Sequence, residues 1–254
     1  MPTADGDWRA EKRAAIDAVF DSAGRGDSSR HISPSGRYEL EIVSWEPPSG
    51  WRYSEGIVRS SGRESIAVIR RNYGQFRFAW CEDHPVGHDY LIAGEDYQGQ
   101  TIIELDTAKR TDYLPGPAQS GHGFCWAKHH VAPDKSVLIV DGCVWACPYE
   151  LVVFDFSQPM QLPYAELHRW SGDLAVVDGF DDRGTLSWTF DREVRLSDGK
   201  PYVDLTDDEE AALLDDAGNY LPGVLGSQTY RGRWRAGDPF ESTEITLVES
   251  TASE

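Results

Sequence analysis

The stretch Phe78-Ala79-Trp80 returns as Phe124-Cys125-Trp126, 46 positions later, and this return decides the fold that the sequence predicts. At the same spacing, Asp89–Ala93 is matched by Lys135–Ile139. A third pair, 49 positions apart, consists of Ile102–Asp106 and Leu151–Asp155. A period of about 40–50 residues built from short strands is typical of propeller blades. The repeat therefore predicts an all-β, propeller-like fold.

About four blade-type repeats can be placed along the chain, and the fourth is the weakest. Their approximate bounds are 30–75, 76–121, 122–170 and 171–205. In the fourth unit, strands are expected over Leu174–Val177 and Thr185–Phe190. Because four blades is the small limit for a closed propeller, an open or partial propeller and a twisted β-sandwich fit the same pattern.

Two turns at matching places of these units support the repeat. Ser33–Arg37 precedes a strand expected over Tyr38–Trp45, and Ala132–Lys135 precedes Ser136–Val140. Proline presets the backbone of a turn and aspartate tolerates its special angles. These turns resemble the Ser-Pro-Asp-Gly-Lys turns before the second strand of blades in WD40-like propellers. The resemblance covers residues 30–200 and implies architecture only, since that fold hosts many functions.

Short helices are expected on either side of the repeats. Asp7 can cap a helix over 7–23, whose apolar stripe is formed by Ile16, Val19 and Phe20. The sequence Thr206–Glu209 has the form of a capping box ahead of a second helix over 207–215. Residues 216–240 are Gly-rich and are expected to be irregular. The expected parts are a helical appendage (1–29), the β repeats (30–205) and a C-terminal segment packed on the β body (206–254).

Composition limits the classes of partner. The chain of 254 residues is 40% hydrophobic, which is globular, and its formal net charge is −19. Such a field repels phosphate backbones and anionic lipids, so we expect neither a nucleic-acid nor a membrane partner. The charge serves solubility or attracts a basic protein. We see no secretory signal and no apolar run of membrane-spanning length, so we expect a cytoplasmic protein with reduced cysteines.

Two loops are the predicted binding face. In a blade, the loop between the second and third strands faces the same end as the loop between blades, and the resemblance implies that this end binds ligands. Here these loops are 95–100 and 141–150, and both are longer than ordinary strand turns. The candidate binding residues are Glu95, Asp96, Tyr97, Gln98, Asp141, Trp145, Tyr149 and Glu150.

The same region offers three kinds of chemistry, each with a structural alternative. Zinc takes four nitrogen or sulfur ligands, and the metal candidates are His122, Cys143 and Cys147. They belong to a Cys/His-rich stretch that also holds Cys125, His129 and His130. Cys143 is a candidate nucleophile, and Asp96 with Asp141 could do acid–base work. The alternatives are buried thiols, exposed imidazoles and solvated turn carboxylates.

We expect a protein-interaction scaffold that binds a partner through this loop face. The acidic charge suits a basic partner, and an inhibitor or immunity protein that neutralises a basic toxin or enzyme is the concrete form. The competing class is a small-substrate hydrolase or lyase that uses the loop carboxylates or Cys143, with metal assistance in one version. No cofactor is expected unless zinc is bound, and the oligomeric state is left open.

Overall fold

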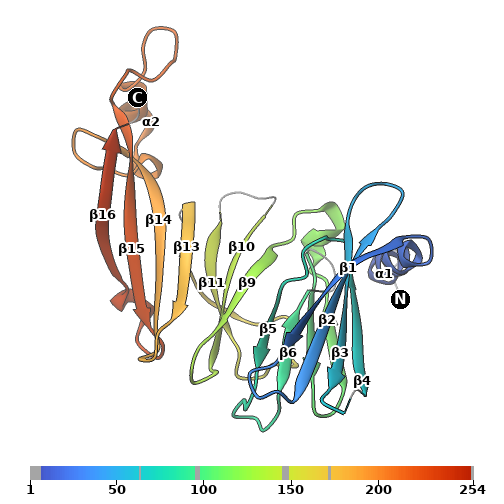
Figure 1. Ribbon diagram of the computed structural model, residues 1–254. Helices are drawn as coiled ribbons and strands as arrows, with labels where there is room; N and C mark the ends of the chain where they lie inside the picture. The colour runs from blue at the N-terminus through green and yellow to red at the C-terminus, as the bar shows by residue number, and fades with distance from the viewer. Residues whose placement is uncertain (1–6, 63, 95–97, 145–148, 171–172, 253–254) are drawn as a thin grey trace, which may run out of the picture. The chain divides into compact units, whose positions relative to one another are not determined.

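The computed structural model describes residues 7–62, 64–94, 98–144, 149–170 and 173–252. Within these residues the chain is mostly β-structure, with four antiparallel four-stranded sheets and two α-helices (Figure 1). In the same part of the chain, no helix has the length and apolar character that a membrane span requires. The expected all-β class with short helices is therefore confirmed.

The contacts divide the chain into two compact units. The first unit comprises residues 1–146 and 152–167, and the second comprises 147–151 and 168–254. The division passes through the third sheet. Strands β11 (Glu150–Asp155) and β12 (Glu166–Trp170) of that sheet therefore contribute residues to both units.

The first unit begins with helix α1 (Trp8–Phe20), whose N-cap is Asp7 as expected. The first sheet follows in chain order and consists of β1 (Gly24–Ile32), β2 (Tyr38–Glu46), β3 (Tyr53–Ser60) and β4 (Ser65–Arg71). The second sheet repeats this order with β5 (Phe78–Cys81), β6 (Tyr90–Ala93), β7 (Gln100–Glu104) and β8 (Lys109–Tyr113).

The third sheet shows that the sequence repeat is a repeat of strands. Its order is β9–β10–β11–β12, with β9 at Cys125–Val131 and β10 at Val137–Cys143. The repeated aromatic segments mark the first strand of the second and third sheets, and the two later pairs of segments mark the second and third strands. The period in the sequence therefore arises from equivalent positions in neighbouring sheets.

Apolar clusters join consecutive sheets of the first unit. One cluster takes Leu40 and Val58 from the first sheet and Leu91 and Ile103 from the second. The next takes Tyr90 and Ile92 from the second sheet and Leu138 and Val140 from the third. It also includes Phe156, which directly follows β11 of the third sheet. Burying each large apolar side chain contributes about 1.5–3 kcal/mol. Trp80 and Trp126, the repeated tryptophans, pack against these two clusters.

The fourth sheet is completed by the C-terminal part of the chain. Its strands are β13 (Asp173–Phe180), β14 (Thr185–Arg195), β15 (Leu225–Arg235) and β16 (Glu244–Ala252). The first two agree with the strands expected in the fourth repeat. The expectation of an irregular chain over 216–240 was wrong, because β15 lies within it.

The misleading signal in β15 is its composition. Gly226 and Gly232 weaken the strand pattern, but Gly232 is required because a Cβ there would lie 2.2 Å from the Trp188 ring. Helix α2 (Asp207–Ala211) and a loop are inserted between β14 and β15. The Thr206–Glu209 capping box is present in α2, as the sequence predicts.

Candidate functional site

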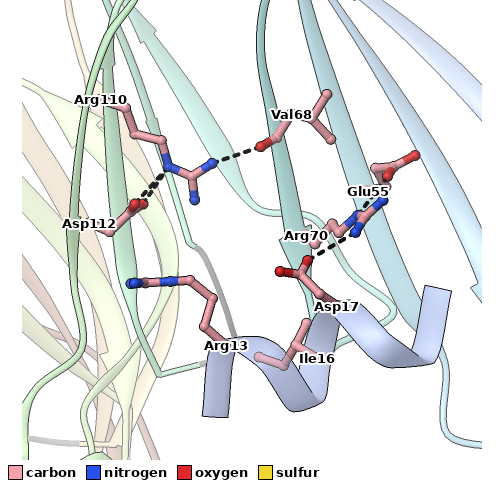
Figure 2. Close-up of a pocket in the computed structure, with 8 residues that line it drawn as sticks. All are labelled: Arg13, Ile16, Asp17, Glu55, Val68, Arg70, Arg110 and Asp112. Carbon is pink, nitrogen blue, oxygen red and sulfur yellow. Dashed lines mark hydrogen bonds and ion pairs between the residues drawn. The ribbon is translucent and has the colours of Figure 1, made fainter. Parts of the chain in front are cut away.

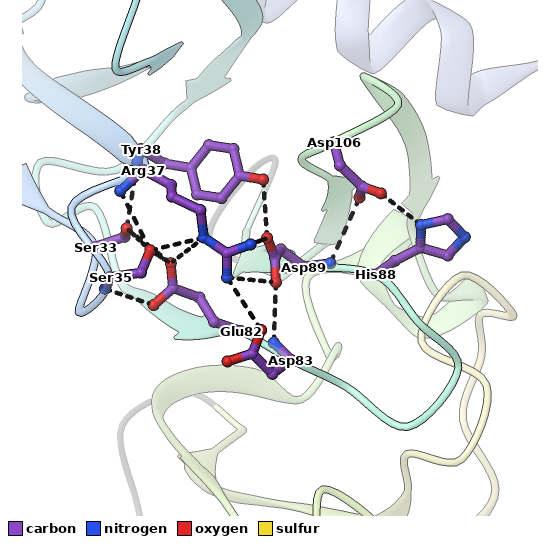
Figure 3. A network of polar contacts seen from close by, with 9 residues as sticks. All are labelled: Ser33, Ser35, Arg37, Tyr38, Glu82, Asp83, His88, Asp89 and Asp106. Atoms are coloured by element: carbon purple, nitrogen blue, oxygen red, sulfur yellow. Dashed lines mark hydrogen bonds and ion pairs between the residues drawn. The ribbon is translucent and has the colours of Figure 1, made fainter.

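The hairpin turns at one end of the first two sheets are joined by a polar network (Figure 3). The Arg37 guanidinium lies 2.9 Å from Asp89 and 3.1 Å from Asp83. Tyr38 donates its hydroxyl hydrogen to the same Asp89 carboxylate at 2.9 Å. Glu82 accepts hydrogen bonds from the backbone N–H of Ser35 at 2.8 Å and from the Ser33 hydroxyl at 2.9 Å. The network fixes the two turns relative to each other.

A single histidine makes the corresponding link between the second and third sheets. His84 is 3% exposed, and its Nδ1 accepts a hydrogen bond from the Val86 N–H at 3.3 Å. Nε2 must then carry the hydrogen, which it shares between the carbonyls of Phe156 at 3.0 Å and Lys135 at 3.1 Å. Burial lowers the pKa of His84, so the ring is held neutral.

A pocket of about 400 Å³ lies where helix α1 covers the outer strands of the first and second sheets (Figure 2). Strands β4 and β8 are the outermost strands of their sheets. Six of the eight residues that line the pocket are charged. The lining consists of Arg13, Ile16, Asp17, Glu55, Val68, Arg70, Arg110 and Asp112.

Ion pairs hold two arginines of this pocket in place. Arg70 lies 3.0 Å from Asp17 of α1 and 3.1 Å from Glu55 of β3, and its guanidinium also lies 4.8 Å from the Phe20 ring centre. Burial alone would lower the pKa of Arg70, but its hydrogen bonds to the two carboxylates outweigh burial and raise it. These contacts also fix α1 on the sheet.

The other side of the pocket is held by Arg110. Its Nε lies 2.7 Å from Asp112, and its Nη1 donates to the Val68 carbonyl at 2.7 Å. This second bond crosses from β8 of the second sheet to β4 of the first. The pocket therefore presents guanidinium and carboxylate groups in fixed positions, which suits recognition of a polar ligand.

A second pocket of about 410 Å³ lies on the first sheet. It is lined by Ser28, Ser29, Arg30, Glu39, Glu41 and Arg59. Its charges are also paired, with Arg59 lying 3.0 Å from Glu41 and Arg30 lying 2.8 Å from Glu39. Unlike the pocket beside α1, it is formed by the strands of one sheet.

Half of the eight predicted binding residues lie outside the described residues, namely Glu95, Asp96, Tyr97 and Trp145. Of the rest, Gln98 is 1% exposed, and its side chain donates to the Gly121 carbonyl and accepts from the Gly123 N–H. It holds a neighbouring loop and presents no surface to a partner. Tyr149 and Glu150 are half-buried, and Glu150 pairs with Arg169.

The two described catalytic candidates, Asp141 and Cys143, lie two positions apart on β10 and are both buried. Asp141 is 6% exposed, and burial raises its pKa. The Lys128 ammonium lies 3.8 Å away, while Oδ1 of Asp141 has no hydrogen-bond partner among the described residues. Cys143 is 5% exposed, so neither group is open to a large substrate.

The metal candidates are not gathered in the described part of the chain. His122 is exposed and contacts the Ser120 hydroxyl at 3.2 Å, whereas Cys143 is buried. Among the described residues, no group of three or more His, Cys, Asp or Glu side chains is arranged to hold a metal ion. Cys147, the remaining candidate, lies outside those residues.

Sequence reasoning missed two buried imidazoles on β9. For the Cys/His-rich stretch that holds His129 and His130, the structural alternative to a metal site was exposed imidazoles. Both ring nitrogens of His129 and Nε2 of His130 are instead buried without a hydrogen-bond partner among the described residues. Burial lowers the pKa of His129 to about 3 and that of His130 to about 4. The available signal was that both histidines follow Trp126 in the same strand, β9. The pocket beside α1 left no such signal, because its residues come from four separate elements.

These features define the class of protein as an all-β protein built from repeated four-stranded antiparallel sheets, with a charged pocket beside its N-terminal helix. No family model matches the chain. It is similar to the uncharacterized protein R762 of Acanthamoeba polyphaga mimivirus, with 29% identity over 235 residues. The similarity covers 86% of this chain and 88% of the viral protein, so it extends well beyond any single sheet.

Proposed function

We propose that the protein is an interaction scaffold that binds a partner protein, and that its sheets are consecutive blades of a propeller-like body. Support for the blades comes from the strand order of the sheets and from the clusters that join the first sheet to the second and the second to the third. The network around Arg37 and the link through His84 add fixed polar contacts between neighbouring hairpins. A scaffold of this kind presents its outer surfaces rigidly, which reduces the entropy lost on binding.

The observation that carries the proposal is the composition of the pocket beside α1. Pockets for small molecules are lined mostly by apolar and aromatic side chains. Here six of eight lining residues are charged, and Arg70 and Arg110 are already oriented by carboxylates. Arginine is enriched at protein interfaces, and the rim of an interface is polar. Val68, which is 41% exposed, supplies an apolar contact beside the charged groups of the pocket.

The charge of the chain points to a basic partner. The net charge of −19 raises the local concentration of cationic proteins and speeds their association. The same field disfavours nucleic acid and anionic membranes. An inhibitor of a basic enzyme or toxin is the concrete form of this proposal.

The competing enzyme hypothesis requires a concave site with convergent groups of shifted pKa. Asp141, His129 and His130, whose pKa values burial shifts, line neither of the two pockets, and neither does Cys81, whose pKa burial raises to about 11. Arg70 lines the pocket beside α1, and its pKa is raised, so its guanidinium stays charged and exchanges no proton near neutral pH. The separation of the buried titratable groups from the pockets favours a binding role over catalysis.

A photocrosslinking experiment tests the pocket directly. A photoreactive amino acid replaces Val68, which lines the pocket, or Val203, which is 86% exposed and lies outside it. We expect crosslinks in a cell extract from position 68 to a protein that position 203 does not capture. The captured protein is then purified, and its Kd is measured by calorimetry.

Charge reversal then separates the pocket from the general field of the chain. Arg110→Glu makes the chain more acidic, which by charge alone would strengthen binding of a basic partner. It also removes the guanidinium that Asp112 and the Val68 carbonyl hold in the pocket, so we expect binding of the purified partner to weaken by about tenfold or more. Arg183→Glu makes the same change of charge in an exposed turn and should leave the Kd nearly unchanged. Equal crosslinking from both positions, or an equal effect of both substitutions, would refute the pocket as the docking site.

A further inference from the structure

Strand β16 forms one edge of the fourth sheet, with β15 as its neighbour (Figure 1). It is nine residues long, which is long for an edge strand. An edge strand leaves a row of backbone N–H and C=O groups that another extended segment can pair with. The β16 edge therefore offers main-chain hydrogen bonds along its length.

Of the features with which proteins usually block unwanted pairing, this edge has one bulge and two glutamates. Lysine, proline and inward-pointing charges protect most edges, and β16 contains no lysine, arginine or proline. Instead it exposes three apolar side chains, with exposed fractions of 42% for Ile245, 54% for Leu247 and 53% for Val248. One bulge lies near its centre, beside Thr229 and Tyr230 of β15.

The two faces of β16 differ in chemistry. Ile245 pairs with Gly232 and Leu247 with Tyr230, so both lie on the face that packs Trp188. Glu244 and Glu249 pair with Arg233 and Thr229, which places both carboxylates on the opposite face. Both glutamates are exposed, and neither forms an ion pair with another described residue.

We propose that the β16 edge binds an extended segment of a partner protein, which adds as a fifth strand and alternates basic with apolar residues. Apolar side chains of that segment would contact Ile245 and Leu247, and its basic side chains would face Glu244 and Glu249 across the new pair. The arginines of β15 lie one strand further away, so the glutamates dominate at the position of the added strand.

Charge argues against a second copy as the occupant. Two β16 strands that pair antiparallel in the register centred on Thr246, with Val248 as the bulged residue, would place Glu244 of each copy opposite Glu249 of the other. Like charges directly opposite each other destabilise a sheet, and each chain carries a net charge of −19. This surface belongs to the second unit and shares no residue with the pocket beside α1, so either proposal can fail alone.

The test uses two fluorescein-labelled ten-residue peptides of the same composition, one alternating lysine and valine and one with five lysines followed by five valines. Binding to the full chain is measured by fluorescence anisotropy at physiological salt. We expect the alternating peptide to bind about tenfold more tightly and to slow hydrogen exchange of the β16 amides. Equal affinity of the two peptides, or unchanged exchange in β16, would overturn the proposal.

Matched variants separate the edge from the overall field. We expect the double variant Glu244→Lys with Glu249→Lys to weaken the alternating lysine peptide about tenfold and to bind an alternating glutamate–valine peptide instead. Asp238→Lys with Glu241→Lys makes the same change of charge at exposed positions outside the strand and should have little effect. An equal effect of the two double variants would show attraction by net charge alone.

The last control tests whether a second copy of the chain, and not another protein, occupies the β16 edge. Leu247→Lys introduces an edge-protecting lysine at an exposed position, and its circular dichroism should match that of the parent chain. We expect this variant to lose the alternating peptide and to sediment as the parent chain does. A parent dimer that Leu247→Lys dissociates would assign the edge to a second copy and contradict the proposal.

Discussion

The two junctions of the first unit are built alike in their apolar clusters but differently at their hairpin turns. Between the first and second sheets, Arg37 bridges Asp83 and Asp89 with a side chain that is 47% exposed. Between the second and third sheets, His84 is 3% exposed and packs edge-on against Phe156 at 5.4 Å. The first arrangement depends on partly hydrated charges, whose attraction salt screens, whereas the second depends on burial. We expect the second junction to supply more stability and to respond more strongly to acid.

The largest expected effect comes from removing the ring at the buried junction. Phe156 is fully buried, and its ring also contacts Tyr164 at 5.4 Å. We expect Phe156→Ala to lower the free energy of unfolding by about 3–5 kcal/mol, measured by urea denaturation. Leu167, which is 45% exposed, is the matched position, and Leu167→Ala should cost no more than about 0.5 kcal/mol. Equal losses at the two positions would contradict the assignment of stability to this junction.

Acid should lower the stability of the part of the molecule that contains His84, His129 and His130. The folded-state pKa is lowered by burial for His84, to about 3 for His129 and to about 4 for His130. In the unfolded chain these groups bind protons near pH 6.5, so unfolding takes up protons below that pH. The contribution of these three histidines to the free energy of unfolding is therefore greatest above pH 6.5 and is lost as the pH drops from 6.5 toward 4.

A single substitution isolates one of these histidines. His129→Phe removes a ring whose nitrogens have no partner among the described residues, so no hydrogen bond among those residues is lost. We expect the loss of stability between pH 7 and pH 4.5 to shrink by about 2 kcal/mol, measured by urea denaturation at each pH. His122→Phe, at an exposed position, is the control. If both variants keep the parent pH dependence, burial of His129 is not its cause.

Substitutions in the polar junction between the first and second sheets should lower stability less than Phe156→Ala. Tyr38 is 7% exposed and donates to Asp89, whose carboxylate also pairs with Arg37. We expect Tyr38→Phe to lower the free energy of unfolding by about 1 kcal/mol, because the buried carboxylate loses one of its donors. Tyr113→Phe is the control at a half-buried position outside the network. A loss as large as that of Phe156→Ala would reverse the proposed ranking of the two junctions.

The strand repeat could be predicted from the sequence because equivalent strands bury equivalent side chains. Trp80 and Trp126 pack against successive clusters, and their return at a fixed interval reports that packing. The sequence pattern did not predict β15, because Gly232 weakens the strand pattern there. That glycine is needed for the close contact with Trp188. Local composition cannot report a contact made with a ring from another strand.

The candidate site could be predicted only where one element carried the signal. The apolar stripe of Ile16 and Phe20 indicated that α1 docks on the β body, and both side chains are buried. Pairing of Asp17 with Arg70, and of Arg110 with the Val68 carbonyl, joins residues far apart in sequence. No spacing rule relates such residues, because their proximity arises from the packing of sheets.

The smallest expected effect concerns a carboxylate that lacks the partners of Asp89. Asp141 is as buried as Asp89, but its nearest cation is the Lys128 ammonium at 3.8 Å, and its Oδ1 accepts no hydrogen bond from a described residue. Burial raises its pKa, so the charged form costs stability above that pKa, and the cost disappears as the pH falls below it. We expect Asp141→Asn to raise the free energy of unfolding at pH 7 by about 0.5–1 kcal/mol, measured by urea denaturation. Asp89→Asn should do the opposite, because it breaks the ion pair with Arg37 and replaces one acceptor oxygen of the network with a donor. Destabilisation by both substitutions would mean that Asp141 is as well compensated as Asp89, and the contrast between the two carboxylates would be lost.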